Sequence, residues 1–570
     1  MRIILILMVL PLLSQALFFS VEPEVEIQGE ELLLRWETSR PVPATRVSFG
    51  IEMPDDPWRS PRWRFVLREE GDSLRKRHEV AFPLRRAEYS SNDVKSLADK
   101  GGELLARIES WDPKWNSLNY HELRFAYAWQ DSQRVLRPAL KLGPWIDRVG
   151  PDSAWLSWTL DRKSPVEVVW GPEGGSTERL RLPSSRSMEL ELSGLKPDQL
   201  YEYRILLPGD LQPRTWTFRT APEPGQWPES GELSFAFMSD SRSGAGGGAE
   251  SVQGTNRRML RNLLSQAEMS GVDFICFGGD LINGYTADPE SYRRQLDSWK
   301  KAAECVGPRI PIYEGMGNHE MLADFFPGEK HSGHGMPPYR DRKGAENSES
   351  LFAEAFVNPL NAPATPGRDH PPFRENVYSF DYGPLHVVAL NNTYDVSSHP
   401  DSLGGYREGE LPEEELAWLD RDLEDARKRG LSEFFVFAHE PAFPCGGHAG
   451  DGMYWNGRIP EMLEMRARFW DILMRHEVRI VFFGDEHNFS LLRVDERLGE
   501  QYRTPVWHVV SGGVGAPFYA RDKSLPWADK LSAFSTIQHF CRIRLDSDGL
   551  SIEARDMRGR ILHQETLRKR

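Results

Sequence analysis

The sequence predicts a multidomain fold, in which two all-β, sandwich-like domains precede an α/β domain. A chain of 570 residues is long enough for several domains. Up to about residue 222, short runs rich in β-branched and aromatic residues are separated by proline and glycine, which is typical of strands and turns. After Gly231, strand-like runs alternate with helical patterns, which is the signature of an α/β domain.

The composition is that of a globular protein with an acidic surface. Hydrophobic residues make up 39% of the chain, charged residues 27%, and the formal net charge is −15. Because this charge repels phosphate backbones, we do not expect a nucleic-acid polymer as partner, although a small charged substrate can still enter a local site. Four cysteines are too few for a disulfide framework, and their spacing identifies no pair.

The N-terminus predicts export. A positively charged start precedes an apolar run at residues 3–13, and small residues precede a cleavage point after Ala16, as in a signal peptide covering residues 1–16. The alternative, a membrane anchor, is disfavoured because this run is too short to cross a bilayer. No cysteine follows for lipid attachment, and no later segment has the length of a transmembrane helix. We therefore expect a secreted or periplasmic protein without a membrane span.

Residues 17–140 are expected to form the first β domain, and nothing in their sequence indicates a role. The second β domain is expected at residues 143–222. Its Leu195, Pro197 and Tyr201 form a Leu-x-Pro-x-x-x-Tyr pattern that resembles the corner of a fibronectin type III domain, where the tyrosine hydroxyl bonds to upstream backbone. Residues 221–225 have the composition of a linker.

The third domain is expected at residues 231–570. We expect helices at about 255–269, 412–429 and 461–476, and an insertion bordering the site at 321–374. The expected strands are residues 233–238, 273–277, 310–316, 387–390, 434–438, 480–483 and 506–510.

Polar side chains follow five of these strands, where ligands bind in α/β sheets. They are Asp240, Asp280, the pair Asn318 and His319, His439, and the pair Asp485 and His487. A pair of divalent cations about 4 Å apart explains such a set, because one carboxylate bridges them and other loops complete their coordination. A metal-bound hydroxide would then be the nucleophile, and a neighbouring free imidazole would protonate the leaving alcohol.

This series of residues resembles the calcineurin-like metallophosphoesterases, and the Gly-Asn-His-Glu stretch that begins at Gly317 is its most specific part. With a fibronectin-like domain in front, the chain is most similar to the purple acid phosphatase branch over roughly residues 143–570. The resemblance implies a four-layer α/β domain, with two mixed sheets flanked by helices, and a metal-dependent phosphatase or phosphodiesterase.

The resemblance also implies roles for individual residues. Asp280 would bridge the two metals, and His319 would be the acid that protonates the leaving group. The remaining expected ligands are Asp240 and His487 for the first metal, and Asn318 and His439 for the second. His448 matches the region of a substrate-binding histidine, and its alternative is a histidine in a glycine-rich turn.

Three residues depart from the family pattern. Arg242 replaces a His or Gly, which indicates either lost metal affinity or gained phosphate recognition. Asn283 replaces the tyrosine whose bond to ferric iron gives the purple colour, so we expect no such colour. Together with Arg242 and His448, Asn283 is a candidate substrate-binding residue. Asp485 replaces a histidine, and because residues two apart on a strand end point the same way, it can act as a ligand beside His487. Glu486 should then face solvent.

The ligand set is rich in oxygen, which favours hard ions such as Mn²⁺, Ca²⁺ or Mg²⁺ over Zn²⁺, with iron also a candidate. We expect an exported phosphoesterase that acts on small phosphorylated substrates, with monoesters favoured over diesters. The three departures motivate the alternative, a catalytically degenerate surface or binding protein on the same fold. The sequence predicts neither the natural substrate nor the oligomeric state.

Overall fold

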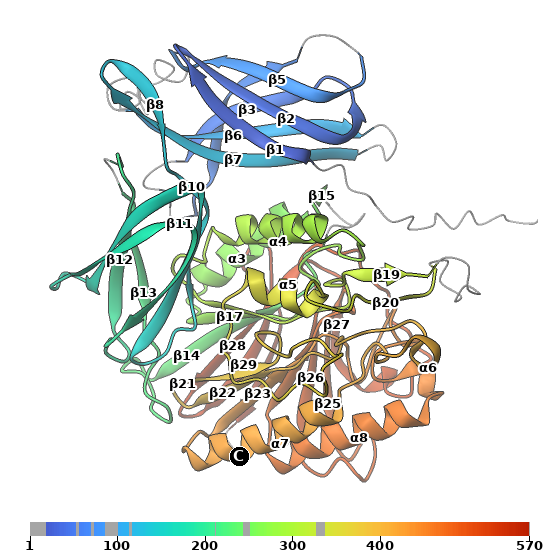
Figure 1. Ribbon diagram of the computed structural model, residues 1–570. Helices are drawn as coiled ribbons and strands as arrows, with labels where there is room; N and C mark the ends of the chain where they lie inside the picture. The colour runs from blue at the N-terminus through green and yellow to red at the C-terminus, as the bar shows by residue number, and fades with distance from the viewer. Residues whose placement is uncertain are drawn as a thin grey trace, which may run out of the picture.

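The computed structural model describes residues 19–52, 56, 58–69, 73–85, 101–112, 117–210, 213–242, 251–326 and 337–568 (Figure 1). The expected signal peptide at residues 1–16, and residues 327–336 of the expected insertion, lie outside this set. Among the helices of the described ranges, none combines the length and the apolar character that a bilayer crossing requires.

The first β region forms two antiparallel sheets. One contains β1 (Phe19–Gln28), β2 (Glu31–Val42) and β5 (Arg75–Pro83) in the order β1-β2-β5. The other has the order β4-β3-β6-β7-β8, with β3 (Arg46–Glu52), β4 (Pro61–Arg68), β6 (Gly101–Asp112), β7 (Ser117–Gln130) and β8 (Gln133–Arg137). Leu32, Phe49, Phe82 and Phe125 from both sheets share one buried core. The expected all-β sandwich is confirmed.

The second β region is a connected sheet of β9 (Leu140–Asp147), β10 (Ser153–Pro172), β11 (Glu178–Ser193), β12 (Leu200–Leu206) and β13 (Trp216–Arg219). The long strand β10 pairs with β11 along both halves, with β9 along its first half and with β12 along its second. The hydroxyl of Tyr201 accepts a hydrogen bond of 2.9 Å from the backbone N–H of Lys196, as the corner motif predicts. The fibronectin type III assignment and the boundaries 17–140, 143–222 and 231–570 stay predictions.

Two mixed sheets form the centre of the α/β region. The six-stranded sheet has the order β18-β17-β14-β28-β29-β30, and β14, β17 and β18 are parallel. Its strands are β14 (Glu232–Met238), β17 (Phe274–Phe277), β18 (Ile312–Glu314), β28 (His539–Asp546), β29 (Gly549–Asp556) and β30 (Ile561–Arg568).

The seven-stranded sheet has the order β21-β22-β23-β24-β26-β25-β27, and β22, β23, β24 and β26 are parallel. Its strands are β21 (Tyr378–Tyr382), β22 (Leu385–Ala389), β23 (Glu433–Phe437), β24 (Ile480–Phe483), β25 (Phe489–Val494), β26 (Val506–Ser511) and β27 (Leu531–Ser535). The short strands are β15 (Ser251–Val252), β16 (Thr255–Asn256), β19 (Ala323–Phe325) and β20 (Tyr339–Asp341).

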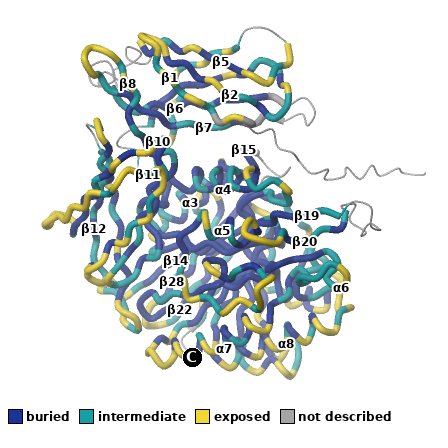
Figure 2. The backbone as a smooth tube through the Cα atoms, in the orientation of Figure 1, coloured by how far each residue is buried: buried dark blue, intermediate teal, exposed yellow. Residues whose placement is uncertain are grey.

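Helices cover the outer face of each sheet and complete four layers. The helices are α3 (Arg257–Met269), α4 (Pro289–Ala303), α5 (Ser348–Ala355), α6 (Pro400–Leu403), α7 (Glu413–Lys428) and α8 (Pro460–Arg475), with 3-10 turns η2 (Trp455–Gly457) and η3 (Ala528–Lys530). Helices α3 and α4 pack on the six-stranded sheet, and α7 and α8 pack on the seven-stranded sheet (Figure 1). Phe235 and Phe237 of one sheet meet Phe435 and Phe482 of the other in a buried core. The backbone at the centre of this region is mostly buried (Figure 2). The expected four-layer fold is confirmed.

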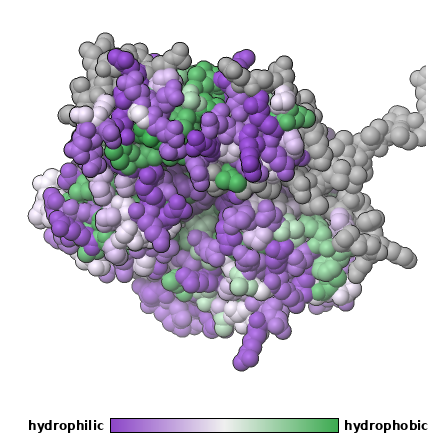
Figure 3. All heavy atoms as spheres, turned by 45° about the horizontal axis from the view of Figure 1, so that its top comes forward, coloured by the Kyte–Doolittle hydropathy of each residue, from purple (hydrophilic) through white to green (hydrophobic). Residues whose placement is uncertain are grey.

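Local details differ from the sequence pattern at element ends. The helix expected from residue 255 begins at Arg257, because residues 255 and 256 pair in the short hairpin β15–β16. Asn256 then caps α3 by accepting a hydrogen bond from the N–H of Met259. On the surface, the face in Figure 3 is mostly hydrophilic with scattered hydrophobic patches, which fits the high charge content.

Candidate metal centre

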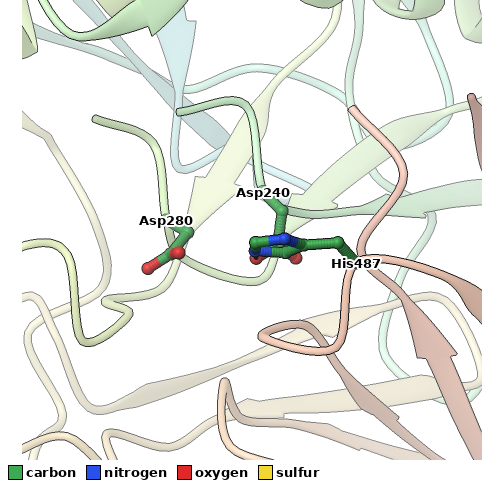
Figure 4. Close-up of side chains that lie close together, drawn as sticks. All are labelled: Asp240, Asp280 and His487. Carbon is green, nitrogen blue, oxygen red and sulfur yellow. Dashed lines mark ion pairs between the residues drawn. The ribbon is translucent and has the colours of Figure 1, made fainter. Parts of the chain in front are cut away.

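The candidate residues converge because the parallel strands of both sheets end at the same edge. Asp240 follows β14, Asp280 follows β17, and Asn318 and His319 follow β18. From the other sheet, His439 follows β23, while Asp485 and His487 follow β24. Figure 4 shows Asp240, Asp280 and His487 on three separate segments of chain, with Asp240 and His487 side by side. The expected convergence of strand ends is present.

The first ligand group consists of Asp240, Asp280 and His487. One potential ligand atom from each lies within 4.8 Å of the others, and His487 Nε2 is 3.5 Å from Asp240 Oδ1. Among the described residues, neither carboxylate oxygen of the fully buried Asp240 has a hydrogen-bond partner. Burial raises the pKa of Asp240 to about 7. A buried carboxylate without partners is unfavourable as an anion, so this group fits a bound cation.

Asp280 lies between the two halves of the centre. Its Oδ1 is 3.2 Å from His439 Nε2 and accepts a 3.0 Å hydrogen bond from the N–H of His319. Its Oδ2 is 3.2 Å from Arg242 Nε. Burial alone would raise the pKa of Asp280, but His319, His439 and Arg242 outweigh it and lower the pKa. Asp280 is therefore held ionised, as a bridging carboxylate must be.

The second ligand group forms around His439. One ligand atom each from His439, Glu440 and Asp485 lies within 4.8 Å of the others. The His439 Nδ1–H donates to the carbonyl of Gly278 at 2.8 Å, which fixes the ring and leaves Nε2 toward Asp280 and Asp485. The side-chain oxygen of Asn318 is buried and, among the described residues, lacks a hydrogen-bond partner. These donors also fit a cation.

The backbone at the centre is strained and closely packed. Asp240, Asp280 and Asp485 have φ angles of 69°, 54° and 59°, a conformation that residues other than glycine rarely adopt and that is often found at functional sites. At Gly317 a Cβ atom would lie 2.6 Å from Asp280 Oδ1 and 2.8 Å from His439 Cε1. The loops can therefore bring these side chains together only if residue 317 has no side chain.

Glu320 ties two of these loops together. Its buried carboxylate accepts hydrogen bonds of 2.8 Å from the N–H groups of Asp280 and Gly317, and one of 3.1 Å from Ile282. The last residue of the Gly-Asn-His-Glu stretch thus fixes the β17 loop against the β18 loop. The sequence pattern identified this glutamate without indicating its contacts.

His319 lies beside Asp280 with its ring orientation fixed. His319 Nδ1 is 2.7 Å from the backbone carbonyl of Asn283, and Nε2 is 3.9 Å from Asp280 Oδ2. Burial and the charge of Arg242 lower the pKa of His319 to about 4. Asn283 thus contributes its carbonyl to the orientation of His319.

Arg242 and His448 both face the centre. Arg242 places Nη2 3.4 Å from His487 Nε2, in addition to its contact with Asp280, and its side chain is 15% exposed. A surface position for Arg242 is therefore excluded. His448 Nδ1 lies 3.3 Å from both Asp485 Oδ2 and Asp451 Oδ1.

Sequence reasoning missed several carboxylates near the second ligand group. Glu440 is fully buried, and Glu408 accepts a 2.6 Å hydrogen bond from the Asn318 side-chain amide. The expectation that Glu486 faces solvent is wrong: it is buried and accepts hydrogen bonds of 3.0 Å from the N–H of His448 and from the Asn488 amide. The position of Glu440 directly after His439, at a strand end, was the available signal.

Comparison with solved structures identifies the architecture. A purple acid phosphatase, PPD1, from yellow lupin (Lupinus luteus) seeds is 14% identical, with 95% of this chain and 93% of that chain covered and a TM-score of 0.55. A structure of PhoD is 13% identical, with 74% of this chain and 88% of that chain covered and a TM-score of 0.53. At these identities the likeness shows a common fold.

Comparison by sequence gives a narrower result. No curated protein matches the chain at a significant level. A model of the calcineurin-like phosphoesterase family matches residues 203–489, a range that contains the candidate residues from Asp240 to His487. Because this match spans half of the chain, the protein belongs to the calcineurin-like phosphoesterase family, a family of metal-dependent phosphoric ester hydrolases.

Proposed function

We propose that the protein is exported and hydrolyses small phosphate esters, with monoesters preferred, at a centre that holds two divalent cations. The observation that carries this proposal is the position of Asp280 between two groups of ligand atoms. The purple acid phosphatase-like fold supports the preference for monoesters, and the residue pattern of positions 1–16 supports export.

The residues divide into two ligand sets with one shared member. Asp240, Asp280 and His487 would hold the first cation. Asp280, Asn318, His439 and Asp485 would hold the second. When bound, the two cations would polarise the phosphoryl oxygens and activate a water molecule for attack. Oxygen donors outnumber nitrogen donors in this set, so we propose Mn²⁺, Mg²⁺ or Ca²⁺ rather than Zn²⁺.

His319 would supply a proton to the leaving oxygen. Its Nδ1–H donates to the carbonyl of Asn283, and this hydrogen bond leaves Nε2 for the proton that is transferred. Because its pKa is lowered to about 4, the ring would carry this proton mainly under acidic conditions. Arg242 would hold a phosphoryl oxygen through its planar guanidinium, and His448, which lies beside Asp485, would also bind the substrate.

The test measures hydrolysis of p-nitrophenyl phosphate and of its bis-ester by the full chain, with Mn²⁺, Mg²⁺, Ca²⁺, iron or Zn²⁺. We expect the monoester to be the better substrate. Substitution His319→Ala should lower kcat by about 10²–10⁴-fold with the metal content unchanged. The control is His399→Ala. His399 is a part-buried histidine outside the centre whose ring forms a hydrogen bond with the Ser398 hydroxyl.

Three outcomes would refute parts of the proposal. Unchanged kcat in His319→Ala removes the acid role of His319. Absence of turnover with every metal, together with retained binding of a phosphate ester, would favour the degenerate binding protein. Full activity in Asp280→Asn would reject the bridged two-cation centre itself.

A further inference from the structure

A cluster of carboxylates overlaps the second ligand group at Glu440 and Asp485, and the proposed function assigns no role to three of its members. Glu440 follows β23, Glu408 lies between α6 and α7, and Asp451 lies between β23 and η2. Asp485 is the fourth member, because its Oδ1 is 4.0 Å from His439 Nε2 while its Oδ2 is 3.3 Å from His448 Nδ1. We call these four residues the acidic pocket.

Backbone contacts bring the members of the acidic pocket together. At Gly409 a Cβ atom would lie 2.1 Å from the carbonyl carbon of Gly452, so the chain after Glu408 touches the chain after Asp451. At Gly452 a Cβ atom would lie 3.1 Å from Glu440 Oε2. Both glycines have positive φ, at 86° for Gly409 and 57° for Gly452, which permits this approach.

Asn392 fixes the direction of Glu440. Its side-chain oxygen accepts hydrogen bonds from the N–H groups of His439 and Glu440, at 3.1 and 3.0 Å. Its side-chain amide donates to the carbonyl of Glu440 at 2.8 Å. The backbone polar groups of Glu440 are thereby occupied, and its side chain extends to Gly452 and the pocket.

The carboxylate of Glu440 is an independent sign of a ligand. Its relative exposure is 0%, and neither of its oxygens has a hydrogen-bond partner among the described residues. Asp451 differs, because its Oδ1 lies 3.3 Å from His448 Nδ1 and its side chain is 26% exposed. Isolated buried carboxylates are strongly unfavourable unless a cation compensates them.

The formal negative charge of the acidic pocket exceeds the positive charge that the neighbouring imidazoles can supply. Two imidazoles contact it: His448 lies 3.3 Å from Asp451 and from Asp485, and His439 lies 4.0 Å from Asp485. The two cations of the proposed centre would already compensate Asp240, Asp280 and Asp485. Glu408, Glu440 and Asp451 add three further carboxylates, and an array of carboxylate oxygens is the environment that hard divalent cations prefer.

We propose that Glu408, Glu440, Asp451 and Asp485 bind a further divalent cation of the hard, oxygen-preferring class, such as Ca²⁺, with His448 at the edge of this site. Asp485 would connect this site to the His439 group through its second oxygen. Because Glu408 and Asp451 lie on loops distant in sequence, the cation would also hold these loops together beside the candidate substrate histidine.

The test counts Ca²⁺ bound by the full chain after removal of metals with a chelator, by equilibrium dialysis and elemental analysis. The wild-type protein should bind one equivalent of Ca²⁺ more than Asp451→Asn. If the variant still binds Ca²⁺ at the further site, its affinity there should be at least about tenfold weaker. The matched control is Glu410→Gln, whose glutamate lies two residues from Glu408 and accepts a hydrogen bond from the N–H of Arg407 instead. This control should bind as many ions as the wild type.

The ion count separates the further site from the two-cation centre, and a second variant covers the case in which the first does not fold. The difference between wild type and Asp451→Asn tests the further site, whereas the number of ions that remains in Asp451→Asn tests the two-cation centre. If Asp451→Asn does not fold, Glu408→Gln replaces it with the same expectation, since Glu408 is only part-buried. Equal stoichiometry and affinity in the wild type and in the folded variant would overturn the proposal.

Discussion

At the scale of single residues, Arg242 distinguishes this centre from one built of metal ligands alone. Its guanidinium is 3.2 Å from Asp280 and 3.4 Å from His487. Removing this charge in Arg242→Ala removes its repulsion of an incoming cation, so metal affinity should rise. If Arg242 holds a phosphoryl oxygen as proposed, its loss should raise KM by about tenfold or more.

Metal titration and a comparison of KM with kcat measure these two effects. The control is Arg374→Ala, whose side chain is 66% exposed and pairs with Glu375. Weaker metal binding with unchanged KM in Arg242→Ala would show that Arg242 supports the metal ligands and not the substrate.

Gly317 is the second residue on which the geometry of the centre depends. An added methyl group would contact both Asp280 and His439, so Gly317→Ala should weaken metal binding at least about tenfold. Metal retention after dialysis measures this effect. The control is Gly150→Ala, where the atoms nearest to the added Cβ lie at 3.5 Å, an ordinary contact distance. Metal retention should not change in this variant. Full metal retention in Gly317→Ala would contradict the close packing of the two ligand groups.

The sequence predicted that the candidate residues that follow strands converge, because the position of such a residue is fixed by the sheet. Asp240, Asp280 and His439 are examples, and they lie together as expected. Glu408 and Asp451 could not be predicted, because their proximity depends on the contact of two loops that are distant in sequence. The side-chain direction of Glu486 was also not predictable, since alternation along a strand does not extend into the turn after β24.

At the scale of elements, His386 joins β22 to β21 and α7. It lies 2.6 Å from Asp381 and 2.9 Å from Asp422. Burial alone would lower the pKa of His386, but its hydrogen bonds to the two aspartates outweigh this effect and raise the pKa. The raised pKa stabilises the folded state fully below the unfolded pKa of about 6.5, and this contribution is lost as the pH rises through the folded value.

The free energy of unfolding of the wild type should therefore fall relative to that of His386→Gln as the pH rises above about 6.5. Urea unfolding across this pH range measures the difference. The control is His399→Gln, in a part-buried histidine that lies outside this contact. A difference between wild type and His386→Gln that is constant with pH would contradict a charged His386.

At the scale of the whole molecule, buried ion pairs connect the first β region to the α/β region. Arg124 of β7 lies 2.9 Å from Glu304, which follows α4, and 2.7 Å from Glu52 of β3. These three side chains are at most 8% exposed. Burial alone would raise the pKa of Glu304, but Lys301 and Arg124 lower it to about 2. The sequence predicted the order of the domains but could not predict this contact, which joins residues 180 positions apart.

Arg124→Met should leave two buried carboxylates with fewer partners and destabilise the protein by about 3–5 kcal/mol. Chemical unfolding, with fluorescence and circular dichroism as probes, measures this change. Arg77→Met is the control, because Arg77 is 90% exposed and should contribute at most about 1 kcal/mol. Equal stability of both variants would show that the connection between the regions does not depend on Arg124.

The central claim is that strand ends from two sheets hold a pair of cations on either side of Asp280. Anomalous diffraction from crystals of the full chain grown with Mn²⁺ tests it most directly. We expect two strong manganese peaks about 4 Å apart, one beside Asp240 and His487 and the other beside Asn318 and His439. Absence of manganese from both positions, with the side chains placed as described here, would contradict it.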